Sequence, residues 1–289
     1  MYTAFYKLNE RPFELTPDLR FLYLSRQHRE ALAHLTYGIA ERKVFVQLTG
    51  EVGTGKTLML DALIHGLDAT TKVARVVNTT ISRVDLIRAL AWELGADATG
   101  RTKMEILKSV SDCLSEWAAA GRNAVFFVDE AQNLEPALLE EVRLLSNMTT
   151  LGRSSLQIVL AGQPELRAKL ENPELRQLRQ RIGIRYHLEP LSVDETGEYV
   201  RHRLHVAGAK DDRIFDASAI EAIFEYSKGI PRTINILCDN ALLAGYADGK
   251  MWIGKRTVRE TAEALETREP IHALRPARDA GQEQSPGRP

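Results

Sequence analysis

Cysteine is scarce in this sequence, and its two copies show no pattern of metal ligation or disulfide pairing. Cys113 and Cys238 lie far apart inside stretches of helical periodicity, and neither has a His or Cys neighbour at metal-ligand spacing. Such usage is typical of buried, reduced thiols in a cytosolic protein. The sequence therefore predicts neither a disulfide framework nor a cysteine-ligated metal.

Long apolar runs and a leader are missing as well. No uninterrupted apolar stretch approaches the roughly 18 residues that identify a transmembrane helix. The N-terminus carries Lys7, Glu10, Arg11 and Glu14 where a signal peptide would have its apolar core. We therefore expect a soluble, cytoplasmic protein with no transmembrane segment of its own, which would reach a membrane only through a partner.

An excess of either charge is also absent. Lys and Arg together number 38, Asp and Glu number 39, and the net charge is −1. This balance argues against a strongly basic nucleic-acid binder, although it allows a local basic patch. The 289 residues are enough for one large domain or two modest ones.

A glycine-rich stretch between an apolar strand and a helix is the strongest signal present. Residues 50–57 read Gly-Glu-Val-Gly-Thr-Gly-Lys-Thr, which is the pattern of a phosphate-binding P-loop (Walker A). The apolar, β-rich flank before it and the helical flank after it disfavour the alternative of a chance glycine-rich turn. Glycines let backbone N–H groups face a phosphate, and the helix N-terminus adds the positive end of its dipole. We expect Lys56 to reach the β- and γ-phosphates of ATP and Thr57 to bind Mg²⁺. The predicted nucleotide-binding residues of this stretch are Gly50, Glu51, Val52, Gly53, Thr54, Gly55, Lys56, Thr57 and Leu58.

Strands and helices alternate over the first two thirds of the chain. Strands are expected at 44–49, 72–78, 124–128, 156–161 and 184–188, and helices at 28–40, 58–64, 83–94, 103–120 and 134–148. This alternation predicts a parallel, doubly wound α/β sheet with helices on both faces.

The pattern changes near Leu191, after which only helices are expected. They lie at 194–207, 216–228, 232–248 and 255–266. The predicted organisation is an aromatic-rich, extended arm (1–27), an α/β domain (28–190), an all-helical lid domain (191–266) and a disordered, Pro-containing tail (267–289). The arm's aromatic residues would pack in a core or against a nucleotide base.

Two carboxylates follow the apolar strand at 124–128. Asp129 and Glu130 match a Walker B pair at the end of a strand that we expect to lie next to the P-loop strand. Asp129 would hold the Mg²⁺ shell, and Glu130 would act as the general base on the attacking water. Asp-Glu after a strand is also an ordinary helix start, but the upstream P-loop favours the catalytic interpretation.

Three further positions could face the phosphates. Gln163 follows the strand at 156–161 and would sense the γ-phosphate, unless it is only a turn residue before Pro164. The run at 176–181 contains Arg176, Arg179 and Arg181, which would be either a solvated helix face or the source of an arginine finger, with Arg181 or Arg179 favoured. Arg232 follows Gly229-Ile230-Pro231 at a helix start, where a cation is unfavourable unless an anion lies nearby.

These motifs, taken in order, resemble those of the AAA+ P-loop NTPases. Longer stretches are similar to the ExeA/GspA-type general secretion pathway ATPases, and the similarity extends from residue 1 to about 266. The stretches that carry it are residues 1–13, 16–18, 21–25, 28–35, 48–57, 129–134, 161–166 and 229–235.

The resemblance implies an ATPase whose oligomer, a ring or a filament, depends on ATP and completes each active site between subunits. It also implies that Gln163 is sensor 1 and Arg232 is sensor 2. Longer relatives continue into a transmembrane helix and a periplasmic peptidoglycan-binding domain, and they help to assemble export machinery. This chain ends in a polar tail and is closer in length to relatives that accompany exopolysaccharide and protein-sorting systems.

Three functions are therefore weighed. The first is a cytosolic ATPase that drives or regulates assembly of an envelope export system. The second is a DNA-binding regulator that resembles transposition-target ATPases, with a pore lined by Arg83, Arg88, Arg101, Lys103 and Lys108. The third is an ATP-gated switch that scarcely hydrolyses, which the complete Walker B pair disfavours.

Overall fold

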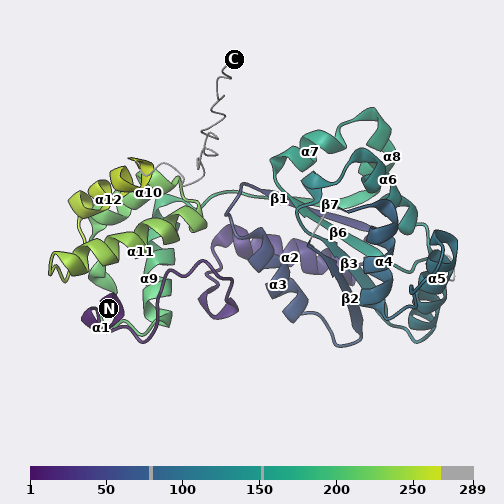
Figure 1. Ribbon diagram of the computed structural model, residues 1–289, viewed down its shortest axis with the longest axis horizontal. Coiled ribbons are helices and arrows are strands. Elements are labelled where there is room, and N and C mark those ends of the chain that lie inside the picture. Colours follow the sequence, from purple (N-terminus) through teal and green to yellow (C-terminus); the bar gives the residue numbers. More distant parts are fainter. Residues whose placement is uncertain (78–80, 151–152, 268–289) are drawn as a thin grey trace, which may run out of the picture.

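The computed structural model describes residues 1–77, 81–150 and 153–267, which form two lobes of different architecture (Figure 1). One lobe holds a parallel sheet with helices on its two faces, and the other is all helical. The N-terminal segment starts on the helical lobe and runs along it before the chain enters the sheet.

Five strands form the central sheet, and all of their pairings are parallel. The strands are β1 (Phe45–Gly50), β2 (Thr71–Val76), β3 (Asn123–Val128), β6 (Gln157–Gly162) and β7 (Ile182–Leu188). Their lateral order is β2-β3-β6-β1-β7. Every residue of β1 and β6 is buried, which agrees with their mainly apolar sequences. The predicted doubly wound α/β fold is confirmed.

Strand alternation divides the apolar side chains between two cores. Phe45, Phe126 and Ile158 pack with helices on one face, whereas Val46 and Val159 pack with those on the other. The first face carries α4 (Arg83–Leu94), α5 (Lys103–Ala119), α6 (Pro136–Leu145), α7 (Pro164–Leu170) and α8 (Arg176–Arg181). The second face carries α2 (Arg26–Ala40) and α3 (Lys56–His65).

One expectation about the sheet is wrong. The strand that ends before Asp129 does not lie next to the P-loop strand, because β6 lies between β3 and β1. Apolar periodicity identifies strands but not their lateral order, which depends on how each crossover helix packs across the sheet. As a result Gln163 directly follows the strand that separates β1 from β3.

The elements that sequence periodicity missed are short. They include the helices α7 and α8 and the antiparallel strands β4 (Thr149–Thr150) and β5 (Arg153–Ser154). Two 3-10 turns, η2 (Ala131–Asn133) and η3 (Pro173–Leu175), were missed as well. The end of the strand expected at 72–78 includes Asn78, which lies outside the described residues.

The helical lobe contains α9 (Val193–Val206), the turn η4 (Asp212–Ile214), α10 (Ala217–Ser227), α11 (Pro231–Ala247) and α12 (Lys255–Thr267). A capping box between Ser192 and Glu195 begins α9 where the sequence pattern changes. Cys238 is buried in this lobe, Cys113 is half-buried in the other, and both are free thiols. The tail expected to be disordered (267–289) lies, beyond Thr267, outside the described residues.

The N-terminal arm packs its aromatic side chains into the helical lobe. Tyr2, Tyr6 and Phe13 join the same apolar core as Leu204 and Leu237. The sequence predicted an extended arm, but the arm is not extended throughout. Backbone hydrogen bonds close a short helix, α1 (Tyr2–Phe5), and a 3-10 turn, η1 (Leu19–Phe21).

Candidate active site

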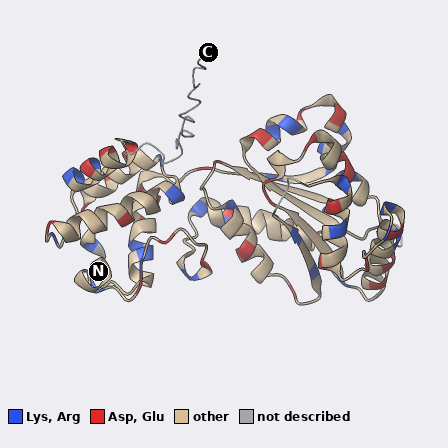
Figure 2. Cartoon of the chain, in the orientation of Figure 1, with Lys and Arg blue, Asp and Glu red and all other residues tan. Residues whose placement is uncertain are grey.

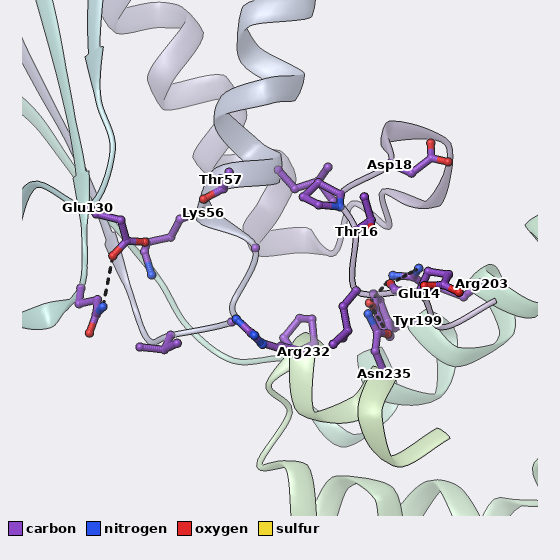
Figure 3. Close-up of a pocket in the computed structure, with 18 residues that line it drawn as sticks. Glu14, Thr16, Asp18, Lys56, Thr57, Glu130, Tyr199, Arg203, Arg232 and Asn235 are labelled. Atoms are coloured by element: carbon purple, nitrogen blue, oxygen red, sulfur yellow. Dashed lines mark hydrogen bonds between the residues drawn. The ribbon is translucent and has the colours of Figure 1, made fainter. Parts of the chain in front are cut away.

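A cavity of about 390 Å³ lies where the P-loop, the arm and the helical lobe meet (Figure 3). The sheet side contributes the P-loop, Glu130 and Gln163. The other walls come from arm residues 14–18 and from residues of α9 and α11, namely Tyr199, Arg203, Pro231, Arg232 and Asn235. A ligand in this cavity would touch both lobes and the arm at once.

The P-loop connects β1 to α3 through two glycines with left-handed backbone. Gly53 has φ of +83° and Gly55, the N-cap of α3, has φ of +98°, a region that side-chain-bearing residues rarely adopt. A Cβ on Gly53 would also lie 2.7 Å from the Cβ of Arg232 in the helical lobe. The loop therefore needs glycine both for its own conformation and for its close contact with the lid.

Lys56 is buried at the first turn of α3, with its ammonium folded back over the loop. Its Nζ donates to the carbonyl oxygens of Gly50 at 2.8 Å and Glu51 at 2.9 Å. Burial lowers the pKa of Lys56, and the carboxylates of Glu130 and Asp129 act in the opposite direction. A buried ammonium group beside the loop is suited to bind a phosphate anion.

Thr57 and Asp129 form a pair of hard oxygen donors beside the loop. The Thr57 hydroxyl donates to Asp129 Oδ2 at 3.0 Å, and the Asp129 side chain is 1% exposed. Oxygen donors of this kind fit Mg²⁺, which is usually held by one or two protein groups together with substrate phosphates. The described ranges contain no cluster of three or more His, Cys, Asp or Glu side chains that could hold a metal ion.

Arg75, which sequence reasoning missed, contacts the same carboxylate. Its Nη2 lies 3.3 Å from Asp129 Oδ2, and its Nη1 pairs with Asp61 on α3. Arg75 is on β2, and strand alternation alone did not reveal that it would face the end of β3. It supplies positive charge to a buried carboxylate that would otherwise be costly.

Glu130 lies between two amide donors. Its Oε2 accepts hydrogen bonds from Gln132 Nε2 at 2.6 Å and from Gln163 Nε2 at 3.3 Å. Glu130 and Gln163 both line the cavity. The order of the strands explains this meeting, because the ends of β3 and β6 are neighbours.

Arg232 projects from the first turn of α11 at the mouth of the cavity. Its backbone N–H donates to the Gly53 carbonyl at 3.2 Å, and its side chain is exposed and lines the cavity. The expected position near a bound anion is therefore compatible with this geometry.

A buried guanidinium joins the arm to the lid, and sequence reasoning missed it. Arg203 on α9 donates to the backbone carbonyls of Pro12 and Glu14 and to the hydroxyl of Tyr199, which in turn donates to Asn235 Oδ1 at 2.8 Å. It also lies over the ring of Phe21, 4.8 Å from the centroid. No sequence signal marks this group, because its partners are spread over the arm and two lid helices.

The arginines at 176–181 lie outside this cavity. Arg181 donates to Ser146 Oγ at 3.0 Å and to Asn147 Oδ1 at 2.6 Å. Arg179 lines a second cavity of about 420 Å³ between the sheet and α7–α8, which also includes Arg167 and Arg185. The chain thus does not bring these arginines to its own P-loop.

Comparison with known proteins places these features in a family context. Residues 39–170 match the model of an AAA domain. The chain is 45% identical over 251 residues to general secretion pathway protein A of Aeromonas hydrophila, a match that covers 86% of this chain and 46% of that protein. It is 26% identical over 159 residues to an uncharacterised HTH-type transcriptional regulator of Methanocaldococcus jannaschii, covering 53% and 37% respectively. The chain thus spans less than half the length of these curated relatives.

Solved structures with the same fold include Cdc6p of Pyrobaculum aerophilum (TM-score 0.67, 18% identity, 86% of this chain and 71% of that one). ORC2 of Aeropyrum pernix has a TM-score of 0.66 at 16% identity, covering 91% and 73%. The branch migration motor RuvB of Thermotoga maritima has a TM-score of 0.60 at 18% identity, covering 86% and 74%. At identities this low the likeness establishes the fold alone. No helix among the described residues is both long and apolar enough to span a membrane.

Proposed function

From the premise that this chain is an AAA+ protein related to general secretion pathway protein A, we propose that it binds ATP with Mg²⁺ and hydrolyses it to ADP and phosphate. The observation that carries this proposal is the meeting of Lys56, Thr57, Asp129, Glu130 and Gln163 at one end of the sheet.

The binding step uses the loop and the lid. The loop from Gly50 to Leu58 wraps the phosphates with backbone N–H groups, and Lys56 neutralises their charge. Thr57 and Asp129 would hold Mg²⁺, and the ion would screen the charge of the phosphate oxygens. The arm (1–27), the α/β domain (28–190) and the lid (191–266) each contribute residues to the cavity lining. In the proposal, arm residues 14–18 would face the base and Arg232 would face the phosphates.

The chemical step needs a base and a group that recognises the γ-phosphate. Glu130 accepts a proton from water as the water oxygen bonds to the γ-phosphorus and the bond to the bridging oxygen of ADP breaks. Gln163 orients that water through its amide. Both side chains are already joined by a hydrogen bond and line the same cavity.

Two substitutions separate binding from chemistry. Glu130→Gln should bind a fluorescent ATP analogue as the wild type does while losing turnover, whereas Lys56→Ala should lose binding itself. Unchanged hydrolysis by Glu130→Gln would remove Glu130 from its assigned role, and unchanged binding by Lys56→Ala would move the nucleotide site elsewhere.

The second part of the proposal concerns what hydrolysis drives. We propose that the chain forms an ATP-dependent homo-oligomer on the cytoplasmic side of the envelope and powers or regulates assembly of a secretion system. Its support is the 45% identity to a protein named for the general secretion pathway. Replacing the native copy with Glu130→Gln should block export through one envelope system, and normal export through all of them would contradict this role.

A DNA-binding role is the second candidate, and the charge distribution weighs against it. Acidic and basic residues are interspersed on both lobes (Figure 2). Among the cations expected to line a pore, Arg88, Arg101, Lys103 and Lys108 each pair with a carboxylate. The cavity that contains Arg167, Arg179 and Arg185 is the local feature that favours an anionic partner. Tight DNA binding with a steep salt dependence near physiological salt would favour this candidate over a secretion role alone.

A further inference from the structure

The side chain of Gln132 connects the ends of two neighbouring strands behind the candidate active site. Its Nε2 donates to Glu130 Oε2 at 2.6 Å, and its Oε1 accepts from the backbone N–H of Gln163 at 3.0 Å. Gln132 is 9% exposed and does not line the cavity, whereas Glu130 and Gln163 both do. One amide thus links the two groups assigned to the chemical step without reaching the ligand.

This link is specific for an amide of this length. The donor end of the amide faces a carboxylate and its acceptor end faces an N–H group. A carboxylate in its place could make only the second of these hydrogen bonds, and a hydrocarbon could make neither. The strand end also leaves room for it, because a Cβ on Gly162 would lie 2.7 Å from Gln132 Oε1. On the other side, Lys169 donates to the backbone carbonyls of Gln132 and Leu134, which fixes the turn η2.

Glu130 is a residue that needs such support. Its backbone has φ of +50°, which is unfavourable for a residue other than glycine and persists only when neighbours enforce it. A general base misplaced by about 1 Å can lose roughly 100-fold in rate. Two amides on the same oxygen restrict where the Glu130 carboxylate lies.

We propose that Gln132 is a positioning residue for ATP hydrolysis, which sets the Glu130 carboxylate and the Gln163 backbone in one arrangement. The proposal rests on the proposed function, in which Glu130 is the base. Since Gln132 does not touch the cavity, its loss should affect the chemical step and leave nucleotide binding intact.

The test compares two variants of Gln132. Gln132→Met keeps the chain length and removes both hydrogen bonds, and we expect kcat to fall about 10- to 100-fold while the Kd for ATP changes less than about twofold. Gln132→Glu keeps the shape almost unchanged and places a second carboxylate against Glu130, so its kcat should fall at least as far. The second variant keeps the test valid if the first one folds poorly.

Gln157 provides a matched control at the other end of β6. It is a buried amide whose Nε2 donates to the carbonyls of Gly38 at 3.1 Å and Lys43 at 2.9 Å, away from the cavity. Gln157→Met should lower the melting temperature and leave kcat per folded molecule unchanged. A purely structural role for Gln132 would give the same result as this control.

The outcomes distinguish this inference from the function on which it rests. If wild-type protein shows no ATP turnover, or Glu130→Gln retains it, the proposed function fails first. If the wild type turns over ATP, Glu130→Gln does not, and both Gln132 variants keep wild-type kcat, the positioning role of Gln132 is overturned alone. A parallel loss of ATP affinity in both variants would also overturn it.

Discussion

His28 lies beneath the P-loop, where burial keeps its imidazole neutral. Its Nδ1 is 2.7 Å from Ser25 Oγ and its Nε2 is 3.4 Å from the Thr54 carbonyl. Burial lowers the pKa of His28, against the smaller opposing effects of the Thr54 hydrogen bond and of Glu195. The folded state thus prefers the neutral ring, and its contribution is complete above the unfolded pKa of about 6.5 and is lost as the pH falls through the lower folded value.

We therefore expect acid to destabilise the wild type more than a variant without this group. The melting temperature of the wild type should fall more steeply between pH 7 and pH 5 than that of His28→Gln. His65→Gln, at an exposed position on α3, is the control and should follow the wild type. Parallel curves for wild type and His28→Gln would show that His28 does not titrate as proposed.

A second prediction concerns the close contact between Gly53 and Arg232. Gly53→Ala would place a Cβ 2.7 Å from the Cβ of Arg232, in a backbone region unfavourable to alanine. Gly121→Ala meets the same backbone problem at φ of +74° with nothing within 4 Å, so it isolates strain from contact. Both variants should lose about 1–2 kcal/mol of unfolding free energy. Only Gly53→Ala should also weaken ATP binding, as measured by titration with a fluorescent analogue, and equal affinities would exclude a role for this contact.

At the scale of elements, α9 holds the N-terminal arm in place through hydrogen bonds from Arg203. Arg203 is 6% exposed and donates to the carbonyls of Pro12 and Glu14, where the arm segment that lines the cavity begins. Arg203→Met would leave these carbonyls without their donor and release that wall. We expect ATP affinity to fall about tenfold and the arm to become a site of rapid proteolysis.

Arg201 is the matched control for this experiment. It lies two residues earlier on α9 with an exposed side chain, outside the cavity. Arg201→Met should keep the wild-type Kd and the wild-type proteolysis pattern. If Arg203→Met also keeps both, the arm does not need this clamp to form the cavity.

The elements were predictable where the signal was local. The helix predicted at 83–94 matches α4, and the predicted apolar strands match β1, β3 and β6 within a residue or two. Both signals are local, because the hydrophobic pattern of a helix or strand is formed by residues close together in the sequence. The lateral place of β3 was wrong since it depends on packing across the whole sheet. Short elements such as α8 carry too few residues to show a period.

The candidate site divides in the same way. The P-loop and the Asp129-Glu130 pair are contiguous motifs, and their meeting in space followed from the fold type. Arg75 and Arg203 contact residues far away in the chain, and no single stretch contains both partners. The role of Gln132 could not be inferred until β6 was found beside β3.

For the whole molecule, the two lobes and the arm form one cavity wall each. A ligand that contacts all three would favour one arrangement of the lobes, since contact with each part occurs only when they are together. This arrangement leaves the arginines of α8 on a different surface, where they cannot serve the P-loop of their own chain. An arginine finger from this helix would therefore have to act on a second copy.

Mixing inactive variants tests that relationship between subunits. Arg179→Ala and Glu130→Gln should each be inactive alone, because one lacks the finger and the other lacks the base. In an equal mixture, roughly a quarter of the interfaces would combine an intact base with an intact finger, so ATPase activity should partly return.

Arg181 is the alternative donor of the finger, and the same mixture made with Arg181→Ala decides between Arg179 and Arg181. Arg181 already binds Ser146 and Asn147, so we expect its replacement mainly to lower the melting temperature. Lys56→Ala with Glu130→Gln is the negative control, since both lesions lie in the same subunit's site and no interface becomes complete. If no arginine variant recovers activity with Glu130→Gln while the oligomer persists, α8 does not supply a trans-acting finger.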